Sequence, residues 1–401
     1  YGATIGNGEN VGVSCDGSPG ALMIKTAFIA GMLSTGISVN DAGKLLLPAM
    51  RWAVRFYRMS GGVNISTCSE RTERITIDFI DKTGSSIDRN MEKKIENIFI
   101  RDDFNRCAED CLKEVKELRG INEFYLKNIL NNAKSGNLPF KIALKTCSEF
   151  ASGIISSLLE ELGASFKIYK PGDIKDASHF CGIVKSEGFD LGVDLEESCE
   201  KMLLVDGKGR LVTEDMFIAL ISLVLFRTLK GGTVVVPVSA SNAVETIAKE
   251  YNGNVIRTKT SPRDIMGRLI GRDAKEQLLE QFTMHFDAIA GLIKLLDFMK
   301  TNGLSLSQLV DMLPEIHMHR QEVECGWDAK GRVIRRLIQD HGSCRIETLE
   351  GVKLYRDDGW VLVLPDAEKP VCNVISESMN AEFAQELTNI YARKVRDISR
   401  N

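Results

Sequence analysis

Three consecutive segments near the start of the chain determine the fold: Val11-Gly-Val-Ser-Cys-Asp16, residues 21–33 and Gly36-Ile-Ser-Val39. The first and last are short β-branched runs typical of strands, and the middle one has apolar residues at helical spacing. The same order of strand, polar turn, helix, glycine and strand recurs at 140–169 and again at 233–258. Units of this length predict largely parallel sheet with helices on its faces. We therefore expect an α/β fold with three related α/β/α domains in series.

The intervals between these units predict further helices and a smaller C-terminal domain. Residues 90–130 are charge-rich and predict one or two amphipathic helices, because apolar residues recur at helical spacing: Ile95, Ile98, Phe99, Cys111, Leu112 and Val115. The apolar run 216–226 is too short to span a bilayer and predicts a buried helix. After Pro314 the pattern changes to strands and then a closing helix at 381–395, which predicts a small α+β domain. We expect domains at 1–137, 138–231, 232–313 and 314–401, arranged around a central cleft.

Composition excludes several classes of protein. The chain has 401 residues, of which 44% are hydrophobic and 26% charged, and this excludes collagen-like, coiled-coil and disordered proteins. With 51 basic against 55 acidic residues the net charge is −4, which argues against a nucleic-acid-binding protein. Ten scattered cysteines without a CxxC pair indicate a reducing compartment. No signal peptide is recognised and no membrane partner is expected, so a cytoplasmic location is predicted.

Three landmarks carry a resemblance to phosphomannomutases and phosphoglucomutases. Gly61-Gly-Val-Asn-Ile-Ser-Thr-Cys-Ser-Glu70 with Ile77-Asp-Phe-Ile-Asp-Lys-Thr-Gly84 resembles their active-serine segment, GGVMITASHNP followed by NGIKFFDKDG. Asp190-Leu-Gly-Val193 with 203–209 resembles the strands around their metal loop, and Asp358-Gly-Trp-Val-Leu-Val363 the strand before their phosphate-binding loop. The resemblance implies a four-domain phosphohexomutase fold. It also implies transfer of a phosphoryl group between a phosphoserine and a sugar phosphate, with Mg²⁺ neutralising the developing charge.

The nucleophile segment departs from the family pattern. Cys68 stands at the position of the family serine, Ser69 at that of the next histidine and Glu70 at that of the asparagine. The resemblance places the catalytic position at Cys68 and Ser69. A thiolate can in principle accept a phosphoryl group, but Glu70 and Glu73 put negative charge where that group would lie. We expect this position to be inactive.

The metal loop is altered as well. The family has DGDADR where this chain has Glu196-Glu-Ser-Cys-Glu200-Lys201. The resemblance implies Glu196, Ser198 and Glu200 as the metal positions and Lys201 as a substrate-binding residue. Because Mg²⁺ demands near-octahedral geometry, the longer glutamate arms and the uncharged Ser198 predict a weak or lost site, and we expect no cofactor here. A solvated acidic turn is the favoured interpretation, and residual weak cation binding through Glu196 and Glu200 is the alternative.

The two remaining loops give the other substrate-binding positions. The family phosphate-binding loop RPSGTEP is replaced by Leu364-Pro-Asp-Ala-Glu-Lys-Pro370, which places Asp366 and Lys369 there without the groups that bind phosphate. The family sugar loop GEESGH falls near 276–285, which places Glu280 there.

Residues 91–104, 325–331 and 360–366 are similar to the mutase-like C-terminal half of fused sugar-phosphate nucleotidyltransferases. The resemblance implies a mannose-1-phosphate guanylyltransferase-like domain preceding Tyr1 as a partner. Our first hypothesis is a catalytically degenerate regulatory or assembly module of sugar-phosphate metabolism. The alternative is an active hexose phosphomutase working through Cys68, and a third hypothesis is a cleft that binds a less anionic ligand. Sugar phosphate is the expected small-molecule partner, and homo-oligomerisation is left open.

Overall fold

A computed structural model describes residues 1–67, 74–133, 136–146, 148–270, 276–342, 344–356 and 359–400. The chain forms two compact units. The first comprises Tyr1–Glu214 and Met266–Met312, and the second comprises Asp215–Ile265 and Leu313–Asn401. Each unit is described by itself below.

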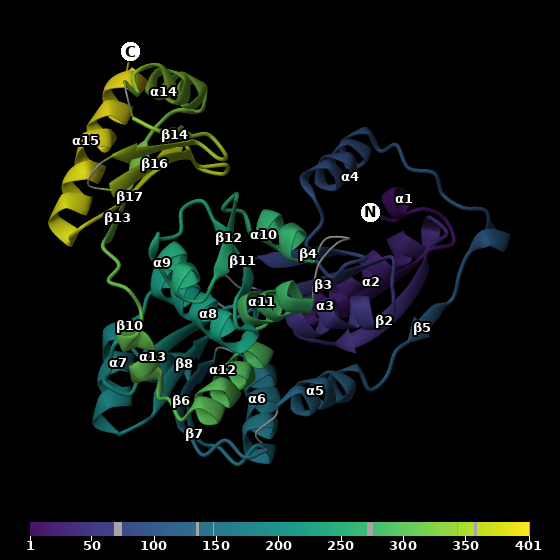
Figure 1. The fold of residues 1–401 in the computed structure, drawn as a ribbon. Helices are drawn as coiled ribbons and strands as arrows, with labels where there is room; N and C mark the ends of the chain where they lie inside the picture. The colour runs from purple at the N-terminus through teal and green to yellow at the C-terminus, as the bar shows by residue number, and fades with distance from the viewer. Residues whose placement is uncertain are drawn as a thin grey trace. The chain divides into compact units, whose positions relative to one another are not determined.

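The first sheet of unit 1 contains five strands in the order β4-β3-β1-β2-β5 (Figure 1). Strand β1 pairs in parallel with β2 and β3, β2 pairs in parallel with β5, and β4 is antiparallel to β3. The bounds of these elements are β1 (Asn10–Cys15), β2 (Ser38–Lys44), β3 (Gly61–Thr67), β4 (Ile75–Asp81), β5 (Val115–Glu117), α1 (Gly2–Ile5), α2 (Pro19–Ser34) and α3 (Leu47–Phe56). The predicted strand at 11–16, helix at 21–33 and strand at 36–39 are confirmed as β1, α2 and β2.

Helices α2 and α3 cover opposite faces of this sheet. The side chains of Val11 and Val13 form a buried cluster with Ala21 of α2. Gly12 lies between these valines and therefore faces the other side, where a side chain would meet Met50 of α3. The sheet is thus a buried middle layer, as predicted for an α/β/α domain.

The segment 90–130 only partly follows the prediction. Helices α4 (Arg89–Arg101) and α5 (Ile121–Asn132) are confirmed, but the helical prediction around Cys111 and Val115 is wrong. Helix α4 ends at Asp102, whose φ of 51° is left-handed. The chain then forms a short 3-10 turn, η1 (Glu109–Cys111), and the edge strand β5, which takes its hydrogen bonds from β2. Pairing with a sheet edge has overridden the local helical pattern here.

The second sheet of unit 1 has the order β10-β9-β8-β6-β7. Strand β6 is parallel to β7 and β8, whereas β9 runs antiparallel to β8 and β10. Its elements are β6 (Lys141–Thr146), α6 (Glu149–Glu161), β7 (Ser165–Tyr169), η2 (Pro171–Asp173), α7 (Ala177–Ser186), β8 (Leu191–Leu195), β9 (Met202–Asp206) and β10 (Leu211–Val212). The second strand–helix–strand unit is therefore confirmed. Unit 1 also contains α11 (Glu276–Phe286), α12 (Ala288–Asn302) and α13 (Leu306–Asp311).

Unit 2 begins with the predicted buried helix, α8 (Glu214–Leu229), and the third strand–helix–strand unit. This unit forms the parallel pair of β11 (Gly232–Pro237) and β12 (Gly253–Thr258), connected by α9 (Ala243–Glu250) and followed by α10 (Pro262–Leu269). The C-terminal part is an antiparallel sheet in the order β13-β17-β16-β15-β14. Its elements are β13 (Met318–Glu324), α14 (Trp327–Gln339), β14 (Ile346–Glu347), β15 (Val352–Arg356), β16 (Gly359–Pro365), β17 (Val371–Ser378) and α15 (Ala381–Arg400).

Helices α14 and α15 lie side by side against the C-terminal sheet (Figure 1). Val333 of α14 and Tyr391 of α15 share a buried apolar cluster with Val361 of β16 and Val374 of β17. This arrangement confirms the predicted α+β pattern after Pro314. Within the described ranges, no helix has both the length and the apolar character needed to cross a membrane.

Gly253, at the start of β12, gives a test of the packing in the third strand–helix–strand segment. A Cβ atom at this position would overlap the ring of Phe226, which is completely buried and cannot move aside. We expect Gly253→Ala to lower the free energy of unfolding by about 1–3 kcal/mol in chemical denaturation. The control is Gly153→Ala in α6, where a Cβ meets open space and the exchange should be neutral or slightly stabilising. Equal stability of Gly253→Ala and wild type would contradict this packing.

Candidate functional site

The predicted nucleophile position, Cys68 and Ser69, lies outside the described residues, as do Glu70 and Glu73. The strand that leads to it is well anchored. Asp16 accepts hydrogen bonds from the backbone N–H of Thr67 at 2.7 Å, from the Thr67 hydroxyl at 3.0 Å and from the N–H of Ser18 at 2.8 Å. Burial opposes ionisation of Asp16, but these hydrogen bonds leave its pKa below the usual value. A charged Asp16 therefore fixes the end of β3.

The predicted metal positions lie on one tight loop between β8 and β9. The N–H of Glu196 donates to the carbonyl of Lys201 at 3.1 Å, and the N–H of Cys199 donates to the carbonyl of Glu196 at 2.9 Å. Cys199 has a left-handed φ of 57°, and the Ser198 hydroxyl accepts from the N–H of Glu200 at 3.2 Å. Glu196 and Lys201 are exposed. Several backbone N–H groups of the loop, and the hydroxyl of Ser198, thus form hydrogen bonds within the loop and stabilise its conformation.

Glu200 is tied to Arg51, a residue that the sequence analysis did not single out. The Nε of Arg51 donates to Oε1 of Glu200 at 2.5 Å, and the two side chains are only 3% and 18% exposed. The remaining nitrogens of Arg51 donate to the carbonyl of Gly84 at 3.1 Å and the hydroxyl of Ser86 at 3.0 Å. The prediction of a solvated acidic turn is therefore wrong for Glu200, because its carboxylate is buried in an ion pair.

Burial dominates the electrostatics around Arg51. It raises the pKa of Glu200, and the positive charge of Arg51 opposes this shift. The same balance raises the pKa of Asp78 on β4, where burial outweighs the attraction to Arg51. Glu196 is exposed as a residue, but partial burial of its carboxyl group raises its pKa, with Lys201 acting against the shift. One guanidinium thus faces two carboxyl groups, one from the loop and one from β4, and compensates their charge only in part.

This arrangement does not fit a Mg²⁺ ion. Mg²⁺ requires a compact set of oxygen ligands, normally with one or two free carboxylates. Across the described ranges, no group of three or more His, Cys, Asp or Glu side chains is placed to hold a metal. Glu200 is engaged by Arg51, and Ser198 by the loop backbone.

A second cluster of titratable groups lies behind this loop, at the start of α12. The carbonyl of Cys199 accepts from the N–H of Ala288, and Asp287 caps the helix by accepting from the N–H of Ala290 at 3.0 Å. The hydroxyl of Tyr125 donates to Asp287 at 2.8 Å. Burial raises the pKa of Asp287 to about 6. Burial also raises the pKa of Tyr125 well above its usual value, and the nearby Asp287 acts in the same direction.

Glu280, the predicted sugar-loop residue, lines a cavity of about 290 Å³ beside this cluster. Its carboxylate pairs with Lys294 of α12 at 2.5 Å. The same cavity is lined by Trp52, Tyr125 and Asp287. The structure therefore brings Glu280 close to Asp287 and α3.

The predicted phosphate-loop residues lie on the hairpin turn between β16 and β17 of unit 2. Asp366 accepts from the N–H groups of Glu368 at 2.8 Å and Lys369 at 2.9 Å, and these bonds lower its pKa. The ammonium of Lys330 donates to the carbonyls of Asp366 and Lys369, and the Lys369 side chain approaches Glu322 at 3.4 Å. The turn is held by its own Asp366 and by Lys330 of α14.

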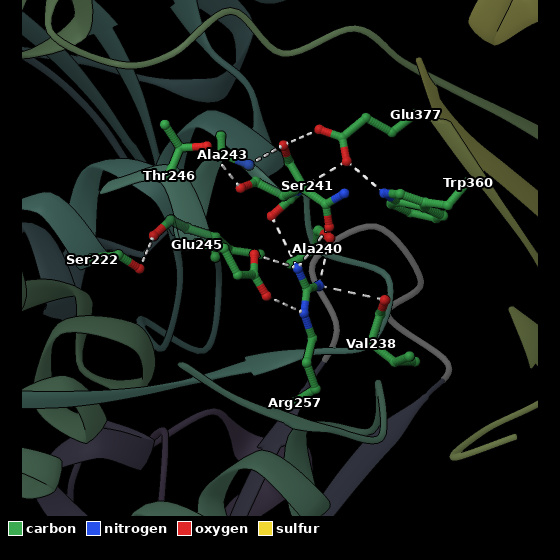
Figure 2. A network of polar contacts seen from close by, with 12 residues as sticks. Ser222, Val238, Ala240, Ser241, Ala243, Glu245, Thr246, Arg257, Trp360 and Glu377 are labelled. Carbon is green, nitrogen blue, oxygen red and sulfur yellow. Dashed lines mark hydrogen bonds and ion pairs between the residues drawn. The ribbon is translucent and has the colours of Figure 1, made fainter. Parts of the chain in front are cut away.

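Figure 2 shows a polar network in unit 2 that fixes the loop after β11. Arg257 donates to both carboxylate oxygens of Glu245, at 2.9 and 2.7 Å, and to the carbonyl of Ala240 at 2.6 Å. Glu377 of β17 accepts from the Ser241 hydroxyl, from the Asn242 N–H at 2.8 Å and from Nε1 of the buried Trp360 at 2.6 Å. A single carboxylate thus ties this loop to the C-terminal sheet.

Lys353 of β15 supports the same contact. Its ammonium is buried, lies 3.7 Å from the centre of the Trp360 ring and donates to the carbonyl of Val238 at 2.9 Å. Burial lowers its pKa to about 7, and the charge of Arg257 acts in the same direction.

The folded chain can be compared with known proteins. Residues 1–106 match the family model described as phosphoglucomutase/phosphomannomutase, alpha/beta/alpha domain I, and residues 213–316 match the model for domain III. The chain contains domains I and III of the phosphoglucomutase/phosphomannomutase superfamily. A relative from Thermococcus kodakarensis named phosphoglucomutase/phosphomannomutase is 28% identical over 91% of this chain and 85% of its own length.

The superfamily fold extends over the whole chain. A crystal structure of a phosphoglucomutase/phosphomannomutase family protein from Burkholderia thailandensis has a TM-score of 0.82, with 15% identity, and the match covers 99% of this chain and 91% of that one. An N-acetylphosphoglucosamine mutase from Aspergillus fumigatus, solved with GlcNAc-6P and magnesium, has a TM-score of 0.58 at 12% identity over 88% and 92% of the two chains. The predicted phosphohexomutase fold is thereby confirmed, and a structure in the family contains magnesium.

Arg51 could have been found from the sequence. Leu47, Met50, Arg51 and Val54 occupy positions i, i+3, i+4 and i+7 of one helix face, so an arginine stands in a core position. A buried arginine requires a carboxylate partner. Which carboxylate it pairs with could not be read from the pattern, because Glu200 lies 149 positions away.

The carboxyl group of Asp287 predicts a specific pH dependence. Its folded-state pKa of about 6 is above its unfolded value, so the folded protein binds the extra proton and stability falls as the pH rises from about 4 to 6. Asp287→Asn keeps the helix cap and removes this ionisation. We expect the variant to gain about 3 kcal/mol relative to wild type over that interval, measured by chemical denaturation at several pH values. A constant difference between the two proteins would contradict the buried carboxyl.

The three hydrogen bonds of Glu377 predict a loss of stability when its side chain is removed. Glu377→Ala leaves Nε1 of the buried Trp360 without an acceptor and should cost about 2–4 kcal/mol in chemical denaturation. Glu377→Gln is the matched control, because an amide can still accept from Trp360 and Asn242 and should cost much less. Similar losses for the two variants would exclude this network as the cause.

Proposed function

We propose that this chain is a phosphohexomutase-fold protein of sugar-phosphate metabolism that has lost metal-dependent phosphoryl transfer and acts as a regulatory or assembly module. The buried ion pair between Arg51 and Glu200 carries this proposal. It places a fixed positive charge against the loop where the family resemblance implies Mg²⁺, and it withdraws the Glu200 carboxylate from coordination.

The other loops support the same conclusion. Phosphoryl transfer depends on charged and hydrogen-bonding groups that point at the phosphate. In this chain the Ser198 hydroxyl accepts from its own loop, and Asp366 accepts from backbone N–H groups of its own turn. These side chains stabilise loops instead of facing a ligand.

The alternative is an active hexose phosphomutase in which Cys68 carries the phosphoryl group. The mutase names of the relatives support this alternative, and Cys68 stands at the position of the family serine. Incubation with glucose 1,6-bisphosphate followed by intact-mass analysis separates the two hypotheses. A phosphate adduct that Cys68→Ala abolishes and Cys181→Ala retains would favour the alternative.

The partner follows from the sequence resemblance and is likewise a proposal. The module would act beside a mannose-1-phosphate guanylyltransferase-like domain, and it could do so as a monomer or a homo-oligomer. Adding the purified chain to such an enzyme tests this, with the nucleotidyltransferase rate and the mass of the complex as readouts. No change in either would contradict the partner.

The catalytic prediction is tested by a mutase assay. With glucose 1-phosphate or mannose 1-phosphate, Mg²⁺ and a bisphosphate activator, we expect turnover below about 1 s⁻¹, the lower end of common enzyme rates. The physical reason is that, in the part of the chain that the structure describes, no set of carboxylates is placed to hold the metal. Faster turnover that depends on both Mg²⁺ and Cys68 would overturn the proposed function.

A further inference from the structure

Unit 1 contains a cavity of about 600 Å³ at the N-terminal end of β3. Leu279 of the predicted sugar-loop segment contributes to its lining, but the metal and phosphate loops do not. Its polar wall includes Arg55 and Arg58 from the end of α3, Ser60 immediately before β3, and Lys82 from the turn after β4. Strand β3 runs from Gly61 to Thr67, so this cavity lies about 20 Å from the end that leads to residue 68. It is therefore separate from the predicted nucleophile position.

Arg55 is the unusual member of this wall. Its Nε is buried and has no hydrogen-bond partner among the residues that the structure describes. The guanidinium lies 5.2 Å from the centre of the Phe282 ring, which supports its flat face and leaves its edge to other partners. Gly84 has a φ of 86°, and a Cβ atom there would lie within about 3 Å of the aliphatic carbons of Arg55, so a glycine leaves space for this side chain. Burying an arginine donor without an acceptor is costly. The Nε atom itself has no surface that a ligand could reach, so a ligand in the cavity would meet the remainder of the guanidinium.

The charge of the wall indicates what that acceptor is. Arg55, Arg58 and Lys82 contribute three positive charges, and the one carboxylate in the described lining is Glu9, which accepts from the hydroxyl of Ser60. Asp287, which lines the adjacent cavity together with Arg55, offsets part of the Arg55 charge, and the positive charge that remains suits an anion. The planar guanidinium of arginine can donate two parallel hydrogen bonds to the oxygens of a phosphate or carboxylate group.

Most of the remaining lining is apolar, apart from Thr4 and Thr83, and it indicates an organic group next to the anion. Ile5, Met59, Met91 and Leu279 form this part of the cavity. A volume of about 600 Å³ is in the usual range for small-molecule sites. A free inorganic ion would leave these side chains without a contact.

We propose that this cavity binds the phosphate group of a small phosphate monoester, with the edge of Arg55 and the side chains of Arg58 and Lys82 as its ligands. The site goes beyond the proposed function, because it does not use the metal, nucleophile or phosphate loops that the family resemblance implies.

Binding can be measured by titration calorimetry at constant ionic strength near neutral pH, with glucose 6-phosphate, inorganic phosphate and glucose as probes. We expect glucose 6-phosphate to bind more tightly than inorganic phosphate and glucose not to bind. Arg58→Gln and Lys82→Gln should each weaken glucose 6-phosphate binding about tenfold, and Arg55→Met by more than that. Arg58 and Lys82 are exposed, so their variants should fold normally.

Two controls locate the binding site. Lys93→Gln removes an exposed charge on α4 outside the cavity and should leave the affinity unchanged. Lys201→Gln examines the β8–β9 loop, and it should also leave the affinity unchanged. The proposal is overturned if wild type does not bind glucose 6-phosphate, if the three cavity variants bind as wild type does, or if only Lys201→Gln weakens binding. None of these results depends on whether the chain has mutase activity.

Discussion

The ion pair between Arg51 and Glu200 is the constraint on which the rest of the site depends. Arg51 occupies a core position of α3, and a charge withdrawn from water there must be paired and hydrogen-bonded. Its guanidinium joins α3 to two other parts of unit 1: the β8–β9 loop through Glu200, and the turn after β4 through Gly84 and Ser86. Removing either partner would leave an unpaired buried charge, whereas hydrogen bonds within the β8–β9 loop hold its backbone. An internal cation thereby stands against the loop where the family resemblance implies a metal.

In the other loops too, charged side chains form hydrogen bonds with groups of the same chain. Asp366 closes the hairpin turn that the family resemblance assigns to phosphate binding, and Glu377 fixes the loop after β11 to the C-terminal sheet. Asp287 caps α12 and accepts from Tyr125 behind the metal loop. The scaffold of sheets and helices is that of a phosphohexomutase, whereas the charged side chains on its described loops mostly bind the chain itself. Arg55 differs from them, because its buried Nε has no such partner within the described ranges.

The periodic parts of the fold could be predicted from the sequence, and the long-range pairings could not. The three strand–helix–strand units and the buried helix α8 follow from apolar spacing and terminal glycines, which depend only on neighbouring residues. The helical prediction around Cys111 failed because hydrogen bonding to the edge of a sheet decided the structure there. Glu200 was placed correctly on its loop, but its burial depends on Arg51, 149 positions earlier in the chain. The position of Glu280 beside Asp287 and Tyr125 likewise depends on how α3, α5, α11 and α12 pack.

Direct measurement of metal binding tests the central claim, that an arginine has replaced the metal. Isothermal titration of the purified chain with Mg²⁺ and with Mn²⁺ should show no saturable binding in the millimolar range, for wild type and for Glu200→Gln alike. The account would be contradicted if wild type bound one equivalent of either ion and Glu200→Gln abolished that binding, because Glu200 would then be a metal ligand and not the partner of Arg51.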